Sequence, residues 1–410
     1  MSFLYVLRHF ILCLTIFAIS VDLSASSFNS ELGLESRFFI EDGRNDQERF
    51  QPSVRANLEY QYQQDANSFE LELFGRADLE DAERSHADVR EAYWTHVADN
   101  WEMKAGVSKV FWGVTESRHL VDVINQTDLV ENPDAEDKLG QPMLKFSVER
   151  DRGLLDIFLL PYFRERTFPG ASGRLNALPY HIDTNNAEYE SSAEQWRSDF
   201  SFRYATWLDD LEIAISHFSG TSRQPLLRFN NNQANPAFIP VYKQIDQTGL
   251  ELQYLYEAWF WKLEAISSSG ENQRYTAAVF GFEYTQVGVF DTAADLGWLA
   301  EYLFDDRRNQ SSFEKAAPHS FERDVFFGIR LALNDIDSTE VLTGVIYDPK
   351  TEEAFYSLEF SQRVANDVKL NLEIRAFQGA EGDASSPESQ FKTYQLQDED
   401  YLQLELVKFF

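Results

Sequence analysis

The chain has almost no cysteine, and its one residue of this type lies near the start. Cys13 falls within an apolar stretch, 10–19, which follows Arg8 and precedes the small residues 24–27. A basic start, about ten apolar residues and then small residues are typical of a cleavable secretory signal. We therefore expect a signal peptide over 1–26 and a single mature domain over 27–410. That domain would contain no disulfide, no catalytic thiol and no Cys-ligated metal.

Basic residues and long apolar runs are also scarce. The chain has 36 Lys and Arg against 68 Asp and Glu, a net charge of −32. Nucleic-acid binding is therefore excluded, because contacts with phosphates require a basic surface. After the signal, no run approaches the roughly 18 apolar residues of a transmembrane helix. In a membrane such a chain must form a closed β-barrel, since only helices and barrels satisfy every backbone group in lipid. The alternative is a secreted or periplasmic all-β protein.

What the sequence does have is alternation of apolar and polar residues with a period of two. In the last segment, 401–410, the leucines share one face of a strand, and Gln403 and Glu405 share the other. The same pattern recurs over 31–38, 54–62, 69–73, 200–204, 211–215, 250–256, 325–331 and 368–374. The predicted fold class is all-β.

The connections between these segments alternate in length. Tight turns are expected near 64–67, 98–100, 149–153, 209–210, 257–258, 334–337 and 365–367, and longer polar loops over 41–51, 113–141, 164–193, 219–240, 306–320 and 378–392. Short turns on one rim and long loops on the other are typical of a bacterial outer-membrane barrel. The count is 18 antiparallel strands. The nearest alternative is 16, because residues 241–256 fit either one strand or two.

Strand phase predicts which side chains face the lumen. Apolar faces should point at lipid, and polar faces should line a lumen that is wide enough for water at this strand number. The lumen-lining candidates are Glu72, Arg76, Arg90, Trp94, Lys104 and Arg203, and further inward acidic residues include Glu35, Glu212, Glu251, Glu264 and Glu301. Acidic residues are somewhat in excess, which favours cations or neutral solutes. For any one of them the alternative is a solvated or mutually paired lumen charge.

The most distinctive segment, FWGVTESRHLVDVIN, covers 111–125 and opens the loop 113–141. Its apolar residues need packing partners, so we expect the loop to fold back into the barrel rather than pack on the outer rim. The pore-constriction candidates are Glu116, Arg118, Asp122 and Asp128, together with Arg164 and Arg166, which are expected to pair with Glu116 or Asp122.

An acidic run follows in the same loop, formed by Glu131, Asp134, Glu136 and Asp137. It suits either a divalent cation or a solvated loop, and it lacks the ligand spacing of an EF-hand. The seven histidines show no HExxH spacing, and the chain has no GxSxG elbow, P-loop or GxGxxG. We therefore predict no metal site, no cofactor and no enzymatic activity.

By its signal, its strand layout and the terminal Phe410, the chain resembles the porin-like outer-membrane barrels of Gram-negative bacteria. The loop 113–141 is similar in position to the constriction loop of general porins, which also follows their fifth strand. The FWGVTES…VDVIN segment resembles a stretch in proteobacterial members of this group. The resemblance implies an outer-membrane location, contact with lipid and lipopolysaccharide, and recognition of Phe410 by the barrel-assembly machinery. A homo-oligomer remains open.

The strand count is also similar to that of sugar-specific porins and the alginate exporter. Sugar porins use a ladder of lumen aromatics, for which Phe39, Phe74, Trp94 and Trp112 are candidate rungs. The exporter has a strongly basic lumen, whereas this chain is acidic. The expected function is a channel for small hydrophilic solutes, narrowed by 113–141. Two rivals remain: a selective exporter or importer of an oligosaccharide or lipid-like molecule with a periplasmic partner, and a plugged adhesin or structural barrel.

Overall fold

The computed structural model describes residues 26–410 except 44–46, 177, 179, 232–235, 271–273, 310–320, 380–395 and 397. The expected signal peptide lies outside these residues but for its last position. So do parts of the predicted loops 41–51, 219–240, 306–320 and 378–392. No helix in the described residues is long and apolar enough to cross a membrane.

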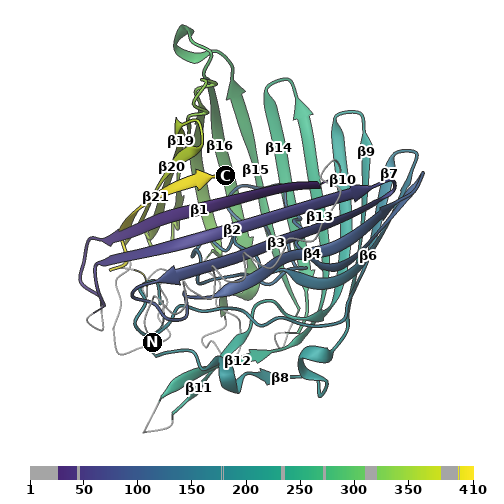
Figure 1. The fold of residues 1–410 in the computed structure, drawn as a ribbon, viewed down its shortest axis with the longest axis horizontal. Helices are drawn as coiled ribbons and strands as arrows, with labels where there is room; N and C mark the ends of the chain where they lie inside the picture. The colour runs from purple at the N-terminus through teal and green to yellow at the C-terminus, as the bar shows by residue number, and fades with distance from the viewer. Residues whose placement is uncertain are drawn as a thin grey trace.

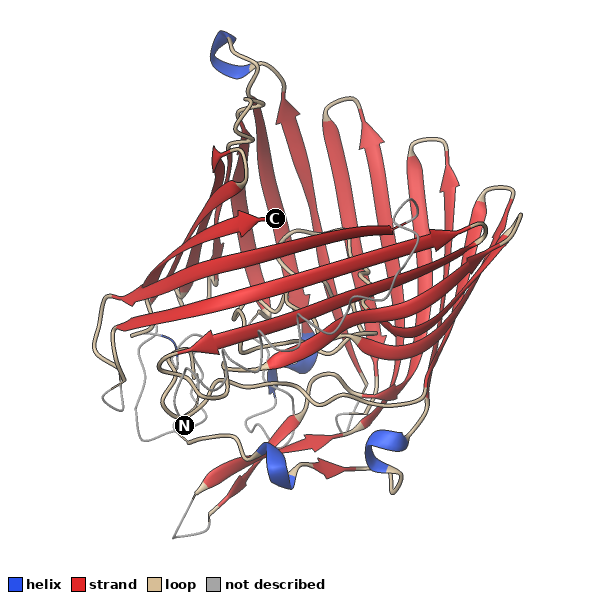
Figure 2. Cartoon of the chain, in the orientation of Figure 1, coloured by secondary structure: helices blue, strands red, loops and turns tan. Residues whose placement is uncertain are grey.

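Eighteen antiparallel strands form one sheet, in which β21 pairs with β1 and closes a barrel (Figures 1 and 2). In chain order these are β1 (Ser26–Phe39), β2 (Phe50–Gln64), β3 (Asn67–Asp78), β4 (Ala87–Val97), β5 (Trp101–Ser108), β6 (Gln141–Arg150), β7 (Gly153–Leu160), β9 (Asp199–Leu208), β10 (Leu211–Thr221), β13 (Gln244–Tyr256), β14 (Trp259–Ser268), β15 (Tyr275–Gln286), β16 (Asp295–Asp305), β17 (Arg323–Ala332), β18 (Glu340–Tyr347), β19 (Ala354–Ala365), β20 (Val368–Gln378) and β21 (Tyr401–Phe409). The predicted all-β class and the count of 18 are confirmed.

The two rims of the barrel differ as the connection lengths predict. Several turns on one rim have two residues, and Asp65, Asp151, Asp209 and Glu257 open them with φ of 50°, 48°, 52° and 53°. Positive φ of this kind suits the tight hairpin turns whose twist matches that of the strands. The other rim carries the long connections. There β8 (Glu188–Tyr189), β11 (Leu226–Asn230) and β12 (Ala237–Tyr242) form a small second sheet beyond the barrel (Figure 1).

The small sheet also resolves the ambiguity over 241–256. Residues 237–242 belong to β12 in the small sheet, and 244–256 form the single barrel strand β13. The stretch therefore adds one strand to the barrel, not two.

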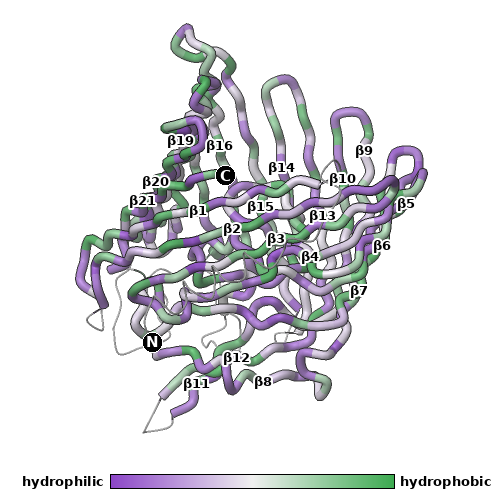
Figure 3. Tube along the Cα trace, viewed as in Figure 1, coloured by the Kyte–Doolittle hydropathy of each residue, from purple (hydrophilic) through white to green (hydrophobic). Residues whose placement is uncertain are grey.

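Apolar and polar residues alternate along the strands (Figure 3), so successive side chains fall on opposite faces of the wall. Ile215, Phe280 and Phe327 are 49%, 51% and 57% exposed on the outer face. Glu35 and Arg37 are buried on the inner face. Beside the turn 257–258, Trp259 stacks on Trp261, as expected for an aromatic belt at a membrane interface.

The apolar core lies inside the barrel rather than between layers. Residues 109–140, which connect β5 to β6 and which we call the inner loop, bury Trp112, Val121 and Ile124 against the inner face of β6, β7, β10 and β13–β18. The inward residues there include Ile266, Val279, Leu299 and Phe326. The expectation that inward faces are uniformly polar is therefore wrong for this half of the wall. The alternation of residues along a strand does not indicate that a loop will cover its inner face.

Candidate functional site

Two buried glutamates of the wall hold the first part of the inner loop. Glu264 on β14 accepts hydrogen bonds from the backbone N–H groups of Val114 (2.7 Å) and Thr115 (3.1 Å) and from the Thr115 hydroxyl (2.8 Å). Glu301 on β16 accepts from the N–H of Glu116 (2.7 Å) and of Ser117 (2.8 Å). Hydrogen bonds to an ionised acceptor are about twice as strong as neutral ones. The predicted inward orientation of both glutamates is observed, but they anchor a loop rather than line open water.

His119 adds a third anchor between the loop and the wall. Its Nε2 lies 3.2 Å from Glu136, farther along the same loop, and its Nδ1 lies 3.7 Å from Glu264. Burial by itself would lower the pKa of His119, but the neighbouring carboxylates of Glu136 and Glu264 outweigh it and raise this pKa to about 10. A Cβ on Gly113 would lie 2.6 Å from the imidazole, so glycine is required there. The histidine is therefore a charged cross-link at neutral pH.

The later part of the loop is held by arginines from the opposite wall. Arg76 on β3 bridges Glu131 of the loop at 2.7 Å and Glu35 of β1 at 2.9 Å. Arg84, in the connection between β3 and β4, contacts Glu35 at 2.7 Å and donates to the carbonyl oxygen of Val130 at 3.0 Å. The inner loop is thus fixed on both sides of the lumen.

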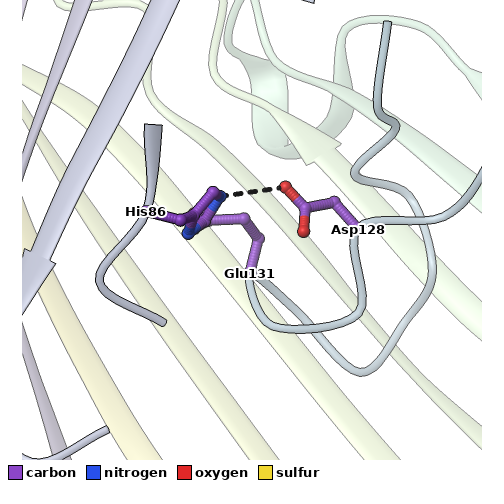
Figure 4. A group of neighbouring side chains, drawn as sticks. All are labelled: His86, Asp128 and Glu131. Carbon is purple, nitrogen blue, oxygen red and sulfur yellow. Dashed lines mark hydrogen bonds and ion pairs between the residues drawn. The ribbon is translucent and has the colours of Figure 1, made fainter. Parts of the chain in front are cut away.

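A histidine with two carboxylates marks the turn between these anchors (Figure 4). His86 Nε2 lies 3.3 Å from Asp128 and 3.7 Å from Glu131, and one ligand atom from each of the three groups fits within 4.8 Å of the others. Both carboxylates already have arginine partners, since Arg90 lies 2.5 Å from Asp128 and Arg76 contacts Glu131. Burial would raise the pKa of Asp128, but His86 and Arg90 outweigh it and lower this pKa to about 2. A metal ion would meet two guanidinium charges here, so the group is better suited to pinning the loop.

The acidic run of the loop is divided among separate partners. Glu131 pairs with Arg76, Glu136 with His119, and Asp134 with Arg375 of β20 at 3.0 Å. The exposed Asp137 accepts a hydrogen bond from the Asp128 N–H through its backbone carbonyl, and its carboxylate has no hydrogen bond or ion pair with the residues that the structure describes. These residues form neither a shared cation site nor a simple solvated loop.

The pore-constriction candidates are dispersed around the loop. Glu116 pairs with Arg330 of β17 at 2.6 Å, towards the short-turn rim, and Asp122 is buried beside Lys138 at 3.0 Å. Asp128 is buried as described above, and Arg118 lines a small cavity behind the loop.

The two pore-constriction candidates in the connection between β7 and β9 also lie apart from Glu116 and Asp122. Arg164 pairs with Asp88 of β4 at 2.6 Å, and the Arg166 guanidinium contacts Gln126 at 3.3 Å. The expected pairing of these arginines with Glu116 or Asp122 is therefore wrong. Arg166 contacts the inner loop at Gln126, whereas Glu116 lies towards the opposite, short-turn rim of the barrel.

Five of the six lumen-lining candidates lie on the inner face. Glu72 pairs with Lys109 (2.8 Å), Arg203 with Glu251 (2.7 Å), and Lys104 lies 3.8 Å above the ring of Tyr93. Arg76 and Arg90 join the inner-loop contacts.

Trp94 lies on the outer face, contrary to expectation. A β-bulge between β3 and β4 leaves Arg90 as an extra residue, so the strand changes phase after it. Tyr93 then points inward to Glu70 (2.6 Å), and Trp94 points outward to Asn67 (3.1 Å). Trp94 is not a rung of a lumen ladder. Trp112 is also removed from it, since this ring is buried against Phe158 at 5.5 Å.

A cavity of about 590 Å³ remains between the inner loop and the wall of β1–β4 and β21. Its acidic residues are Glu35, Glu72, Glu131, Glu136, Asp137 and Glu405, and its basic residues are Arg37, Arg55, Arg76, Arg90, Lys109 and Lys138. Six acids therefore face six bases. Phe74 and Phe111 add two aromatic rings, and Phe111 is 58% exposed.

No family model matches the chain, and no curated protein matches its sequence. Solved structures do match. Wzi of Escherichia coli, described as an outer-membrane protein involved in group 1 capsule assembly and a carbohydrate-binding β-barrel, aligns with a TM-score of 0.53 and 10% identity, over 94% of this chain and 85% of that one. OccD3 (OpdP) of Pseudomonas aeruginosa aligns with a TM-score of 0.51 and 11% identity, over 94% and 90%.

The fold is that of an outer-membrane, porin-like barrel. At this identity the likeness shows the fold alone and carries no residue roles. The closed barrel with its apolar outer face agrees with the predicted outer-membrane location. The anchors Glu264, Glu301 and His119 were not recognised as such from the sequence. Strand phase indicates that the two glutamates point inward, yet their targets are backbone amides, which leave no sequence signal.

Proposed function

We propose that the protein is an outer-membrane channel for small hydrophilic solutes, with its path between the inner loop and the wall of β1–β4 and β21. The observation that carries the proposal is the charged cavity of about 590 Å³ on that side. The apolar side of the loop fills the opposite half of the lumen. In this proposal lipid and lipopolysaccharide surround the barrel, and the exposed Phe410 is the element that the assembly machinery recognises.

The balance of charge in the cavity suggests weak selectivity between ions. Rings of one charge sign set the selectivity of a pore, and here six acids face six bases. Most of them are paired, as Arg55 is with Glu405 at 2.5 Å. We therefore propose passage of neutral or dipolar solutes and of ions of both signs, in place of the cation preference expected from the sequence. The excess acid of the whole chain is not concentrated in this cavity.

Single-channel recording in a planar bilayer tests the proposal. The only cysteine, Cys13, lies in the expected signal peptide, so in a refolded chain of residues 27–410 one introduced cysteine reports on one position. We expect steady conductance, and we expect a charged thiol reagent to reduce it in Asp137→Cys, at the open side of the cavity. Ser192→Cys, exposed in the connection between β7 and β9, is the matched control that should be labelled without effect.

Two outcomes would count against the proposed path. Folded barrels without conductance would mean a sealed lumen and would favour the adhesin or partner-gated export alternatives. Conductance that survives complete labelling of Asp137→Cys would place the path elsewhere.

A second candidate function, saccharide binding at the long-loop rim, has one specific observation in its favour. Trp196 is 73% exposed and packs edge-on against Tyr162 at 4.9 Å. Exposed aromatic faces of this kind suit the apolar faces of sugar rings, and Wzi is described as carbohydrate-binding. Titration of oligosaccharides with tryptophan fluorescence, in the wild type and in Trp196→Ala, distinguishes this activity from the channel.

A further inference from the structure

A second, smaller cavity of about 80 Å³ lies behind the inner loop, away from the proposed solute path. It opens between the loop, the residues after β10, the wall of β13–β15 and the start of the connection after β16. Its volume is enough for several water molecules or one small ion. Its charged lining consists of Arg118, His119, Arg223 and Arg307 against a single acid, Asp122.

Most of these charges already have partners. Arg223 pairs with Asp199 at 2.9 Å, and Arg307 pairs with Asp305 at 2.6 Å. Asp122 lies 3.0 Å from Lys138 on the loop. His119 contacts Glu136 and Glu264, as described above.

Arg118 is the exception. Its backbone carbonyl accepts from Thr115, but within the described part of the chain its guanidinium makes no hydrogen bond or ion pair. Burial, and then the positive charge of Arg307, lower the pKa of Arg118. Asp305, Tyr275 and Asp324 act in the opposite direction. The Arg118 side chain is half-buried at the cavity, and a partly desolvated guanidinium without a counter-charge leaves its loss of hydration uncompensated.

The neighbouring arginines are held in fixed orientations around the same space. Arg307 lies over the ring of Tyr275 at 4.2 Å, and Arg223 lies over the ring of Phe218 at 5.1 Å. Arg223 also donates to the carbonyl oxygen of Ile124 at 2.9 Å, which ties it to the loop. The forks of Arg223 and Arg307 are already engaged by Ile124 and Asp305, so these two groups supply fixed positive charge, and Arg118 supplies the planar fork that can bind two oxygens of a tetrahedral oxyanion at once.

We propose that this cavity binds a small tetrahedral oxyanion, such as phosphate or sulfate, between Arg118 of the inner loop and Arg223 and Arg307 of the wall. The anion supplies the counter-charge that Arg118 lacks. It also links the loop to two barrel connections on the long-loop rim, so it stabilises the seated loop. The site lies off the solute path, and its test is independent of conductance.

The experiment follows thermal unfolding of the refolded barrel in detergent during titration with sodium phosphate or sodium sulfate. Sodium chloride at matched ionic strength is the reference, because general screening acts with any salt. We expect both oxyanions to raise the unfolding midpoint saturably at millimolar concentration and chloride to have no such effect. Calorimetric titration should give one site per chain.

Two variants locate the site. Arg118→Gln should weaken oxyanion binding at least tenfold, and Arg118→Lys should weaken it less, because the charge is kept. Arg49→Gln removes an exposed arginine on the same rim, which pairs with Asp42 at 2.6 Å, and should leave binding unchanged. Equal stabilisation by chloride, or unchanged oxyanion binding in Arg118→Gln, would overturn the proposal and leave a hydrated arginine. If Arg118→Gln does not fold, the wild-type comparison of oxyanion with chloride still decides.

Discussion

At the residue scale, the wall recognises the loop by its backbone rather than by its side chains. Glu301 accepts from two consecutive backbone N–H groups and from the hydroxyl of Ser117 at 2.5 Å. Backbone N–H groups inside a barrel must find acceptors, since an unpaired one costs about 1–3 kcal/mol. A carboxylate that accepts hydrogen bonds from several N–H groups satisfies the backbone of the loop, as a capping residue satisfies the backbone at a helix terminus.

Glu301→Gln should loosen the loop without unfolding the barrel. The amide keeps one acceptor oxygen but loses the charge, and we expect a loss of about 1–3 kcal/mol in the stability of the seated loop. The measured result would be larger current noise and a higher mean conductance. Glu212→Gln is the control, because Glu212 is an exposed inward glutamate on β10 that is far from the loop anchors in sequence. Equal noise in both variants would contradict the anchoring role.

His119 predicts a pH dependence. Its pKa is raised from 6.5 to about 10, so its stabilising charge is fully present below pH 6.5 and is lost as the pH rises through about 10. Conductance should therefore be steady from pH 6 to 8 and become noisy towards pH 10. In His119→Gln the noise should be present at neutral pH and should lack this alkaline rise. An unchanged alkaline rise in the variant would assign it to other groups.

At the scale of elements, the inner loop forms an apolar core inside the barrel. The barrel is closed by hydrogen bonds between its strands, which do not depend on this core. Ile124 is fully buried at the loop–wall contact, whereas the hydrogen bonds of the eighteen strands are independent of it. Ile124→Ala should cost about 2–5 kcal/mol of local stability, the usual effect of a cavity in an apolar core.

The expected result for Ile124→Ala is a barrel that still migrates as a folded species without boiling in gel electrophoresis, with a higher conductance. Ile215→Ala, which removes the same volume from the 49% exposed outer face, should leave the conductance unchanged. Loss of the folded gel species in Ile124→Ala alone would mean that the loop is part of the barrel's own stability.

Sequence reasoning was most successful where structure is local. The period of two in segments such as 250–256 predicts strands and their faces, and the apolar residues of the FWGVTESRHLVDVIN segment predict that it packs inward. It was unsuccessful where one extra residue reverses which side chains point inward, as the bulge at Arg90 does for Trp94. It also missed contacts between distant residues, because nothing in the sequence relates Arg164 to Asp88.

At the scale of the whole molecule, the barrel is divided lengthwise into a filled half and an open half. The open half has balanced charge although the chain carries −32. The reversal potential under a KCl gradient should therefore lie close to zero.

Two matched variants test this balance, because Arg55 and Glu405 form an ion pair at 2.5 Å in the wall of the cavity. Arg55→Gln should shift the potential towards cation selectivity and Glu405→Gln towards anion selectivity, by similar amounts. A strongly cation-selective wild type, or shifts of the same sign in both variants, would contradict the proposed path.

The anchors of the inner loop also have a consequence for biogenesis. Thr115 and Glu264 are 149 residues apart in the chain, Ser117 and Glu301 are 184 apart, and Glu116 and Arg330 are 214 apart. The loop has no surface on which to seat until β14–β17 have formed. In that interval Trp112, Val121 and Ile124 are exposed, as in the aggregation-prone intermediates of other large proteins. The time needed to form those strands sets how long this apolar segment stays exposed to water.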